Sequence, residues 1–307
     1  MNAVLFTIRA LTPIHVGEGR GDGVIDLPFK RSASTRLPIL PGQGNKGVLR
    51  AATRVRVDHP RRAVWEDLFG PEFSNSAARQ GMVSPQDAHL VAFPVSSAMG
   101  LCAWVCCPFT LGTLREKLAD IGQPAPDTPA VTYDKCIASD TVSIELPSTN
   151  GQSHKRAAFG DIDCVLDGDP QALRSQWACK LAELFFNGTK AEYIHEFKSR
   201  LAIVDDSCFQ LLAQFNTEVH ARIRRDEQNP ALAADKALWY EEYMPEQSLF
   251  AGLIGIERVP AANTTVEDAK NWLAGQALDG LNSPPTHLQL GGKASVGKGD
   301  VAWRCIK

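Results

Sequence analysis

Short apolar segments typical of strands alternate along this 307-residue chain with amphipathic segments typical of helices, and this order constrains the fold more than any other feature. Gly and Pro, which interrupt regular structure, separate the segments. Strands are expected at residues 4–10, 90–95 and 101–105, and helices at 44–57, 64–69, 111–121 and 171–186. Interleaved strands and helices without a repeat of fixed period indicate an α+β sheet domain with inserted segments.

A strictly alternating segment around residue 220 predicts a half-exposed strand. Its apolar face would carry Phe215, Val219, Ala221 and Ile223, and its polar face Glu218, His220, Arg222 and Arg224. A polar spacer at 226–230 separates this segment from residues 237–244, so the two can pair as a long hairpin over about 215–247. Such a hairpin either inserts into a nucleic-acid strand or is an ordinary extension with an exposed cationic face.

Two Gly-rich segments also carry polar side chains and suit contact with a phosphate backbone, because Gly lets backbone N–H groups approach a ligand closely. The first, residues 11–50, carries His15, Asp26, Lys30, Arg31 and Lys46. The second, residues 288–299, carries Lys293 and Lys298 but lacks the residue order of a P-loop or a dinucleotide fingerprint. Two interpretations of the second segment stay open, namely RNA phosphate contact and a simple tight turn.

The overall composition, with 44% hydrophobic and 22% charged residues, is typical of a globular protein. Because we find no apolar run of about 18 residues and no secretory leader, we expect a cytoplasmic protein without a membrane partner. The eight cysteines lack the paired spacing of a zinc ribbon and lie mostly among apolar residues. They are expected to be reduced core residues rather than metal ligands or disulfides.

Charge is distributed unevenly along the chain, although the net charge is only −3. Residues 1–62 hold 11 Lys and Arg against 4 Asp and Glu, a local charge of +7, whereas the remainder holds 21 basic and 31 acidic residues, or −10. A polyanion should therefore prefer the surface formed by the N-terminal part, unless these charges are simply solvated.

Several motifs follow one another in a recognisable order through nearly the whole chain. They are Leu-Thr-Pro-Ile-His-Val-Gly at 11–17, Ile-Asp-Leu-Pro at 25–28, Pro-Gly with Lys-Gly at 41–47, Leu-Phe-Gly at 68–70, Phe-Pro-Val at 93–95, Trp-Tyr-Glu-Glu-Tyr-Met-Pro at 239–245 and the Gly-rich loop at 291–299. Through these motifs the chain resembles the backbone subunits of type III-B CRISPR Cmr complexes, in the RAMP superfamily. The motifs at 25–28 and 239–245 point most specifically to this subunit.

The resemblance implies one domain over residues 1–307, a modified ferredoxin-like (RRM-type) palm with inserted helical segments and a β-hairpin thumb over about 215–247. Copies of such a subunit stack in a helical filament along a CRISPR RNA, together with other Cmr subunits. The thumb interrupts the duplex of guide and complementary target RNA at regular intervals, and the target is cut beside each displaced base.

The resemblance also implies a metal-dependent endoribonuclease centred on Asp26. RNA supplies its own nucleophile, because a 2′-hydroxyl can attack the adjacent phosphate in line and leave a cyclic phosphate. Asp26 would activate this hydroxyl or hold a hydrated Mg²⁺ or Mn²⁺. Further catalytic contributions are expected from His15, Glu241 and Tyr243. Without the family, Asp26 would be a turn or cap residue, His15 and Tyr243 structural residues, and Glu241 a solvated side chain.

Seven side chains are candidates for RNA binding, namely Lys46, Arg50, His220, Arg222, Arg224, Lys293 and Lys298. Lys46 and Arg50 lie four residues apart near a helix start, which suits phosphate binding, although an exposed helix face is the commoner explanation. The chain departs from the family pattern at 43–45 and 96–100, so the RNA or subunit contacts of the family at these positions are not carried over. Two rival functions stay open: a backbone subunit without activity, and a metal-independent RAMP nuclease that processes CRISPR RNA through His15.

Overall fold

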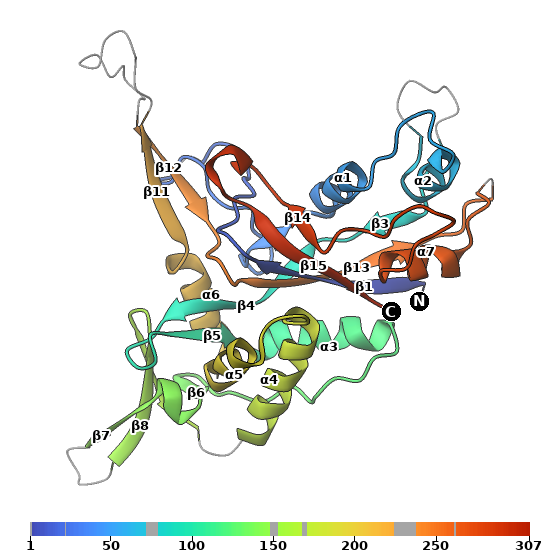
Figure 1. Ribbon diagram of the computed structural model, residues 1–307. Helices are drawn as coiled ribbons and strands as arrows, with labels where there is room; N and C mark the ends of the chain where they lie inside the picture. The colour runs from blue at the N-terminus through green and yellow to red at the C-terminus, as the bar shows by residue number, and fades with distance from the viewer. Residues whose placement is uncertain are drawn as a thin grey trace.

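A large, mostly antiparallel sheet forms the centre of the molecule in the computed structural model (Figure 1), which describes residues 2–21, 23–71, 79–147, 153–167, 171–223, 238–260 and 262–307. Within these ranges the sheet has 13 strands: β1 (Ala3–Ala10), β2 (Ile39–Leu40), β3 (Val83–Pro85), β4 (Ala88–Ser96), β5 (Cys102–Cys106), β6 (Lys135–Ile137), β7 (Ile144–Pro147), β8 (Ser153–Phe159), β9 (Ile162–Leu166), β10 (Leu201–Val204), β13 (Leu249–Ile256), β14 (His287–Gln289) and β15 (Asp300–Ile306). The order is β14-β15-β1-β13-β4-β5-β10-β6-β9-β8-β7, with β2 on β4 and β3 on β13.

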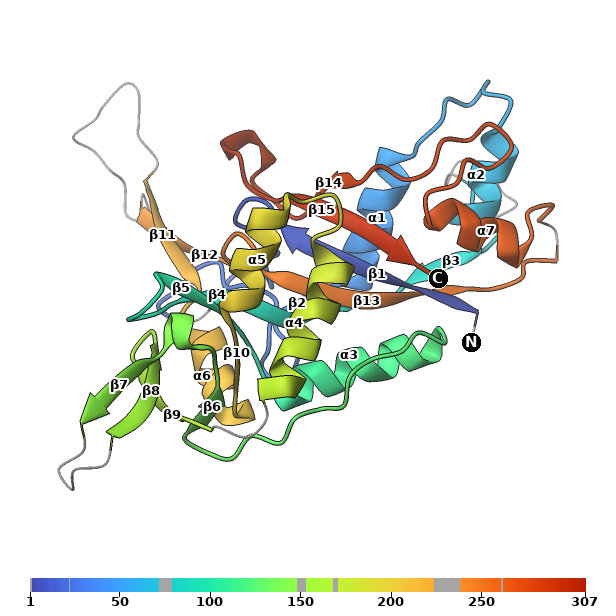
Figure 2. The ribbon, with the colours of Figure 1, turned by 60° about the horizontal axis from the view of Figure 1, so that its bottom comes forward.

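Helices cover both faces of this sheet, as Figures 1 and 2 show. The helices are α1 (Gly42–Ala52), α2 (Arg62–Phe69), α3 (Pro108–Asp120), α4 (Gln171–Phe185), α5 (Ala191–Ser199), α6 (Asp206–Phe215) and α7 (Val266–Leu273). One hydrophobic core contains side chains of α1, α2, α6 and α7, and the other contains side chains of α3, α4 and α5. The predicted α+β arrangement is confirmed.

Strand β1 shows why the chain places a sheet between two layers of helices. Its side chains alternate between the faces, so that Val4, Phe6 and Ile8 join one core while Leu5 joins the other. A strand that is buried on both faces carries apolar residues at successive positions, as β1 does at residues 3–6. Strand β1 pairs with β13 on one side and β15 on the other, and the two chain ends consequently lie close together (Figure 2).

Most of the elements predicted from the sequence are present, with small shifts at their ends. The largest shift is in α1, which was expected at 44–57 and spans Gly42–Ala52. It begins earlier because the N–H of Gly42 donates to Asp87 Oδ1 at 2.8 Å. It ends at the Thr53 cap, where the Thr53 hydroxyl donates to the carbonyl of Leu49 at 2.8 Å. No helix among the described residues is long and apolar enough to cross a membrane.

The predicted hairpin is present as a separate two-stranded sheet that projects from the main sheet (Figure 1). Strand β11 (Glu218–Ile223) pairs with β12 (Leu238–Tyr243), with Glu218 opposite Tyr243 and Ile223 opposite Leu238. Residues 224–237, including Arg224 and the expected spacer, lie outside the described residues. The bridge between Ile14 and Met244 joins the hairpin base to the N-terminal loop.

Two details of the hairpin differ from the sequence interpretation. Phe215 ends α6 instead of belonging to the strand. The alternation itself is confirmed, but the apolar face is the exposed one, since Val219 is 47% and Ile223 65% exposed. The polar side chains His220 and Arg222 are half-buried instead. The alternative of an ordinary extension with an exposed cationic face does not describe β11, because these half-buried side chains contact residues of β12.

Candidate functional site

The carboxylate of Glu241 lies at the centre of a buried polar cluster at the hairpin base. Its side chain has no exposed surface. Oε1 accepts hydrogen bonds from Trp239 Nε1 at 2.7 Å and Lys293 Nζ at 2.5 Å. Oε2 accepts from Arg222 Nε at 3.3 Å and from the hydroxyl of Tyr243. The cluster joins both hairpin strands to the Gly-rich loop of residues 291–299.

These hydrogen bonds determine the charge of the cluster. Burial alone would raise the pKa of Glu241, but the bonds from Lys293, Tyr243 and Trp239 outweigh it and lower the pKa to about 2. Burial raises the pKa of the Tyr243 hydroxyl. At neutral pH Glu241 is thus an ionised acceptor whose two oxygens already have protein donors, and it is poorly suited to donate a proton.

His15 lies against the same cluster from the N-terminal loop. Its Nδ1 is 2.7 Å from the carbonyl oxygen of Glu242, and because a carbonyl only accepts, Nδ1 carries the proton. This leaves Nε2 as the second functional atom of the ring. The His15 ring centroid is 5.3 Å from that of Tyr243, and the carbonyl of His15 accepts the N–H of Gly292 at 3.0 Å.

Basic and aromatic groups surround Tyr243 on the remaining sides. The His220 ring lies 4.9 Å from the Tyr243 ring, and Lys298 Nζ lies 5.3 Å from the same ring centroid. His220 Nε2 also lies 3.1 Å from Glu218 Oε2. The structure therefore brings together seven of the eleven site residues predicted from the sequence: His15, His220, Arg222, Glu241, Tyr243, Lys293 and Lys298.

Asp26 reaches the neighbouring part of the hairpin through its carboxylate, and Leu27 reaches it through its backbone. Its Oδ2 accepts the N–H of Tyr240 at 2.9 Å. The following residue, Leu27, bridges to Glu241: its N–H donates to the carbonyl of Tyr240 at 3.0 Å and its carbonyl accepts the N–H of Glu242 at 3.0 Å. Asp26 is half-buried at this position. The loop of residues 25–31, called the acidic loop below, is thus attached to β12 by hydrogen bonds to Tyr240 and Glu242 and by a bridge opposite Glu241.

The two basic residues of α1 have other surroundings. Arg50 Nη2 donates to the carbonyls of Gly70 and Pro71 at 3.3 and 3.2 Å, and the guanidinium lies 4.9 Å from the ring centroid of Trp65. This arrangement holds α1 against α2. Lys46 is half-buried, and burial lowers its pKa. RNA binding by Lys46 and Arg50 stays a prediction.

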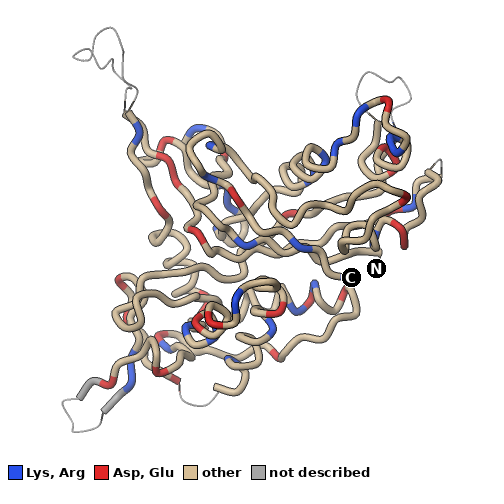
Figure 3. Tube along the Cα trace, viewed as in Figure 1, with Lys and Arg blue, Asp and Glu red and all other residues tan. Residues whose placement is uncertain are grey.

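Sequence reasoning missed two contributors, Trp239 and Glu242. Trp239 donates to Glu241, and Glu242 bonds the acidic loop, with Oε2 accepting the N–H of Phe29 at 2.8 Å. Strand alternation could have separated Glu241 from Glu242, because neighbouring residues on a strand point to opposite faces. Figure 3 shows basic and acidic residues interspersed over the molecule, so the uneven charge along the sequence does not divide the fold into two halves.

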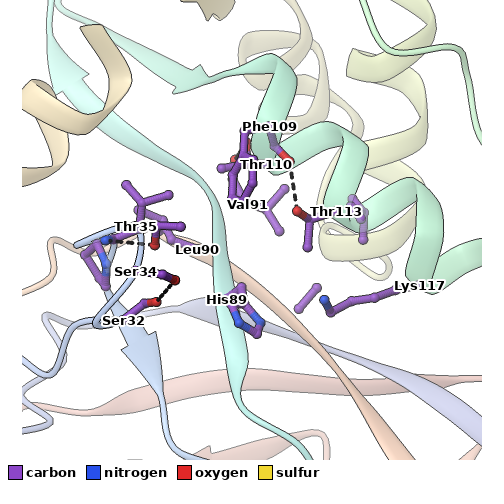
Figure 4. Close-up of a pocket in the computed structure, with 14 residues that line it drawn as sticks. Ser32, Ser34, Thr35, His89, Leu90, Val91, Phe109, Thr110, Thr113 and Lys117 are labelled. Atoms are coloured by element: carbon purple, nitrogen blue, oxygen red, sulfur yellow. Dashed lines mark hydrogen bonds between the residues drawn. The ribbon is translucent and has the colours of Figure 1, made fainter. Parts of the chain in front are cut away.

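Metal-ligating groups and cavities are the other features that could form a binding site. Within the described ranges, no group of three or more His, Cys, Asp or Glu side chains could hold a metal ion. A cavity of about 180 Å³ lies between residues 32–38, β4 and α3, with His89 and Lys117 among its lining residues (Figure 4). None of the predicted site residues lines this cavity.

Comparisons with known proteins place these features in a family. The chain matches the RAMP superfamily over residues 7–302. It is 30% identical over 305 residues to the protein named CRISPR system Cmr endoribonuclease Cmr4 from Pyrococcus furiosus, covering 98% of this chain and 95% of the relative.

Solved structures agree with this match. The crystal structure of oligomeric Cmr4 from Pyrococcus furiosus has a TM-score of 0.69 and 25% identity, covering 99% of this chain and 97% of that chain. A type III-B Cmr-beta structure bound to cognate target RNA has a TM-score of 0.69 at 20% identity, covering 99% of this chain and 96% of that one, and shares the fold. The predicted ferredoxin-like palm is confirmed. The chain belongs to the RAMP superfamily and, within it, to the Cmr4 family.

Proposed function

We propose that this chain is a guide-RNA-binding filament subunit of a type III-B Cmr complex and the endoribonuclease that cuts the complementary target RNA at regular intervals. The attachment of Asp26 to the hairpin base, beside the basic cluster around Glu241 and Tyr243, carries this proposal. The name of the 30% identical relative supports nuclease activity, and the name of the oligomeric Cmr4 structure supports self-assembly.

The chemistry needs a correctly placed 2′-hydroxyl more than it needs a protein nucleophile. In the proposed reaction Asp26 accepts the proton of the 2′-hydroxyl as that oxygen attacks the adjacent phosphate, and the 5′-oxygen leaves. Lys298 and Arg222 would hold phosphates on either side by charge. His15 would protonate the leaving oxygen from Nε2 when its ring carries a proton on both nitrogens, since the Nδ1 proton is held by the carbonyl of Glu242.

Divalent metal dependence is part of the proposal, and Mg²⁺ or Mn²⁺ is the expected cofactor. Mg²⁺ commonly binds through one or two carboxylates, waters and substrate phosphates, and a single loop carboxylate such as Asp26 fits this mode. Oδ2 is bonded to the Tyr240 N–H, so Oδ1 is the oxygen that would either take the proton of the 2′-hydroxyl or contact the hydrated ion. A bound divalent ion would supply charge stabilisation at the reacting phosphate.

Glu241 has a positioning role in this proposal, and Tyr243 is one of the groups that it holds. The Glu241 oxygens are occupied by Lys293, Arg222, Tyr243 and Trp239, so the residue places these groups instead of transferring protons. The proposed partners are a CRISPR RNA, its complementary target RNA, further copies of this chain in a helical filament, and other Cmr subunits. A cytoplasmic location stays a prediction from the sequence.

The deciding experiment compares wild type with Asp26→Asn in the complex assembled on a guide RNA. Wild type should cut a complementary RNA into a ladder of evenly spaced products, and chelation should stop cutting until Mg²⁺ or Mn²⁺ is added. Asp26→Asn should slow cutting by ~100-fold or more with unchanged RNA affinity, because loss of a general base costs about that much. Asp58→Asn, an exposed control, should cut normally.

The same experiment separates the two rival functions. If Asp26→Asn still produces the ladder and the cutting is traced to another subunit, a backbone subunit without activity is favoured. Cutting of CRISPR repeat RNA that resists chelation and depends on His15 would instead favour a processing nuclease.

A further inference from the structure

Glu242 joins three separate segments of the chain through its two carboxylate oxygens. Oε2 accepts the N–H of Phe29 at 2.8 Å. Oε1 accepts from Arg31 Nη2 at 2.5 Å and from the Thr217 hydroxyl at 2.9 Å. The Glu242 side chain is only 4% exposed. It therefore contacts the segment that follows Asp26, the start of the hairpin and β12, while remaining inaccessible to RNA.

Arg31 extends this connection to α6. Its Nη1 donates to the carbonyls of Arg36 and Ala213 at 3.1 and 3.0 Å, and its side chain is 12% exposed. A guanidinium can satisfy several acceptors in one plane, which suits a residue that links a loop, a helix end and a carboxylate. The Glu242–Arg31 pair is thus a fixed connection between the acidic loop and the base of the hairpin.

The position of Asp26 depends on this connection from both sides. Asp26 and Leu27 bond to β12 through Tyr240, Glu241 and Glu242, which fixes the start of the segment. Glu242 fixes its end through the side chain, at positions 29 and 31. The loop that carries Asp26 therefore follows the hairpin base if the hairpin shifts.

We propose that Glu242 is a positioning residue for target RNA cleavage, which with Arg31 sets where the Asp26 carboxylate stands relative to the hairpin. The inference rests on the proposed function of Asp26. Without the carboxylate, a buried guanidinium and a buried N–H lose their acceptor, and the loop must move to satisfy them. A displacement of about 1 Å at a reacting group can cost on the order of 100-fold in rate.

The test measures single-turnover cleavage, RNA affinity and hydrogen exchange in the assembled complex for Glu242→Gln. We expect a ~10- to 100-fold lower rate of cleavage at saturating RNA, unchanged affinity, and faster exchange of the Leu27 and Phe29 amides. Glu242→Asp, which keeps the charge, should recover part of the rate. Glu66→Gln, which removes a half-buried carboxylate from the Arg62 pair on α2, is the matched control and should cut normally.

A second variant covers the case in which Glu242→Gln fails to assemble. Arg31→Lys keeps the positive charge but cannot reach Glu242 and both carbonyls together, so it should reproduce the rate loss and the faster exchange. A wild-type cleavage rate in whichever of these variants assembles would overturn the inference. Asp26→Asn, measured in parallel, separates the hypotheses: if it also cuts normally, the proposed function itself has failed.

Discussion

At the scale of single residues, Glu241 determines the character of the site, because one buried carboxylate accepts hydrogen bonds from four side chains. Two of its donors, Arg222 and Lys293, are cations that would otherwise face each other without compensation. Their charges are held close to the surface at defined points, as contact with a polyanion requires. In the proposed function, Glu241 thus contributes to RNA binding through its neighbours.

The low pKa of Glu241 predicts a specific acid sensitivity. A carboxyl group whose pKa is lower in the folded than in the unfolded state stabilises the fold above the unfolded value, here 4.5, and loses this contribution as the pH falls toward about 2. Urea denaturation of wild type should therefore show a free energy of unfolding that falls over this window. Glu241→Gln should be less stable at pH 7 and should show a shallower fall, whereas equal slopes would contradict the assignment.

Lys298 offers a cleaner test of phosphate contact than Lys293, because its described contact is with the ring of Tyr243. Lys298→Ala should weaken RNA binding for every sequence and should reduce the slope of log affinity against log salt by about 1. Filter binding at several salt concentrations measures both. Lys155→Ala, an exposed change on β8, should leave the slope unchanged.

At the scale of elements, the strength of the local pattern decided how well the sequence could be interpreted. Periodicity identified α4 and β1 to within one residue at each end, β4 to within two and α3 to within three. Helix α7 was not predicted; it has eight residues and depends on a capping box between Thr265 and Asp268. Alternation revealed the hairpin but not which face is buried, since that depends on β12 and on the loop of Lys293.

The candidate site shows the same limit. Residues 15, 26 and 241 are far apart in the sequence, and the resemblance to a family, rather than any local pattern, grouped them as catalytic candidates. Lys293 was predicted from its Gly-rich loop. Glu242 illustrates what remained hidden, because a buried acid is recognisable only when its donors, the N–H of Phe29 and the side chains of Arg31 and Thr217, are known.

The loop of residues 291–299 provides a matched pair of glycines for a test of its packing. Gly291 has φ +74°, and a Cβ there would lie 2.2 Å from the His15 carbonyl oxygen, whereas Gly297 has φ +72° and nothing within 4 Å. Gly297→Ala should cost about 1 kcal/mol for the backbone alone, and Gly291→Ala clearly more, with slower RNA cleavage. Thermal unfolding and cleavage assays of both variants check this, and equal effects would contradict it.

The exposed apolar face of the hairpin predicts a loss of function that is not accompanied by a loss of stability. Because Val219 and Ile223 are largely exposed, replacing both by Ser should change the free energy of unfolding by only about 0.5 kcal/mol. If these side chains separate bases of the guide–target duplex, as apolar wedges do in nucleic-acid complexes, the variant should cut target RNA more slowly. Normal cutting by the double variant would exclude that role.

At the scale of the whole molecule, the proposed reactive loop lies at the base of a projection, while the two cores that stabilise the fold lie on either side of the main sheet. Substitutions of exposed side chains on this projection, such as Val219 and Ile223, should therefore leave global folding largely intact. Figure 1 shows the hairpin and the chain ends at different sides of the main sheet.

The pairing of β1 with β15 sets Leu5 opposite Ile306, so the two ends of the chain lie close together. A short peptide could join them, and the chain could be reopened at an exposed loop, giving a circular permutant with the same sheet. A fluorophore attached at either end would lie away from the hairpin and the proposed site, so assembly of the proposed filament could be followed in real time without labelling the RNA.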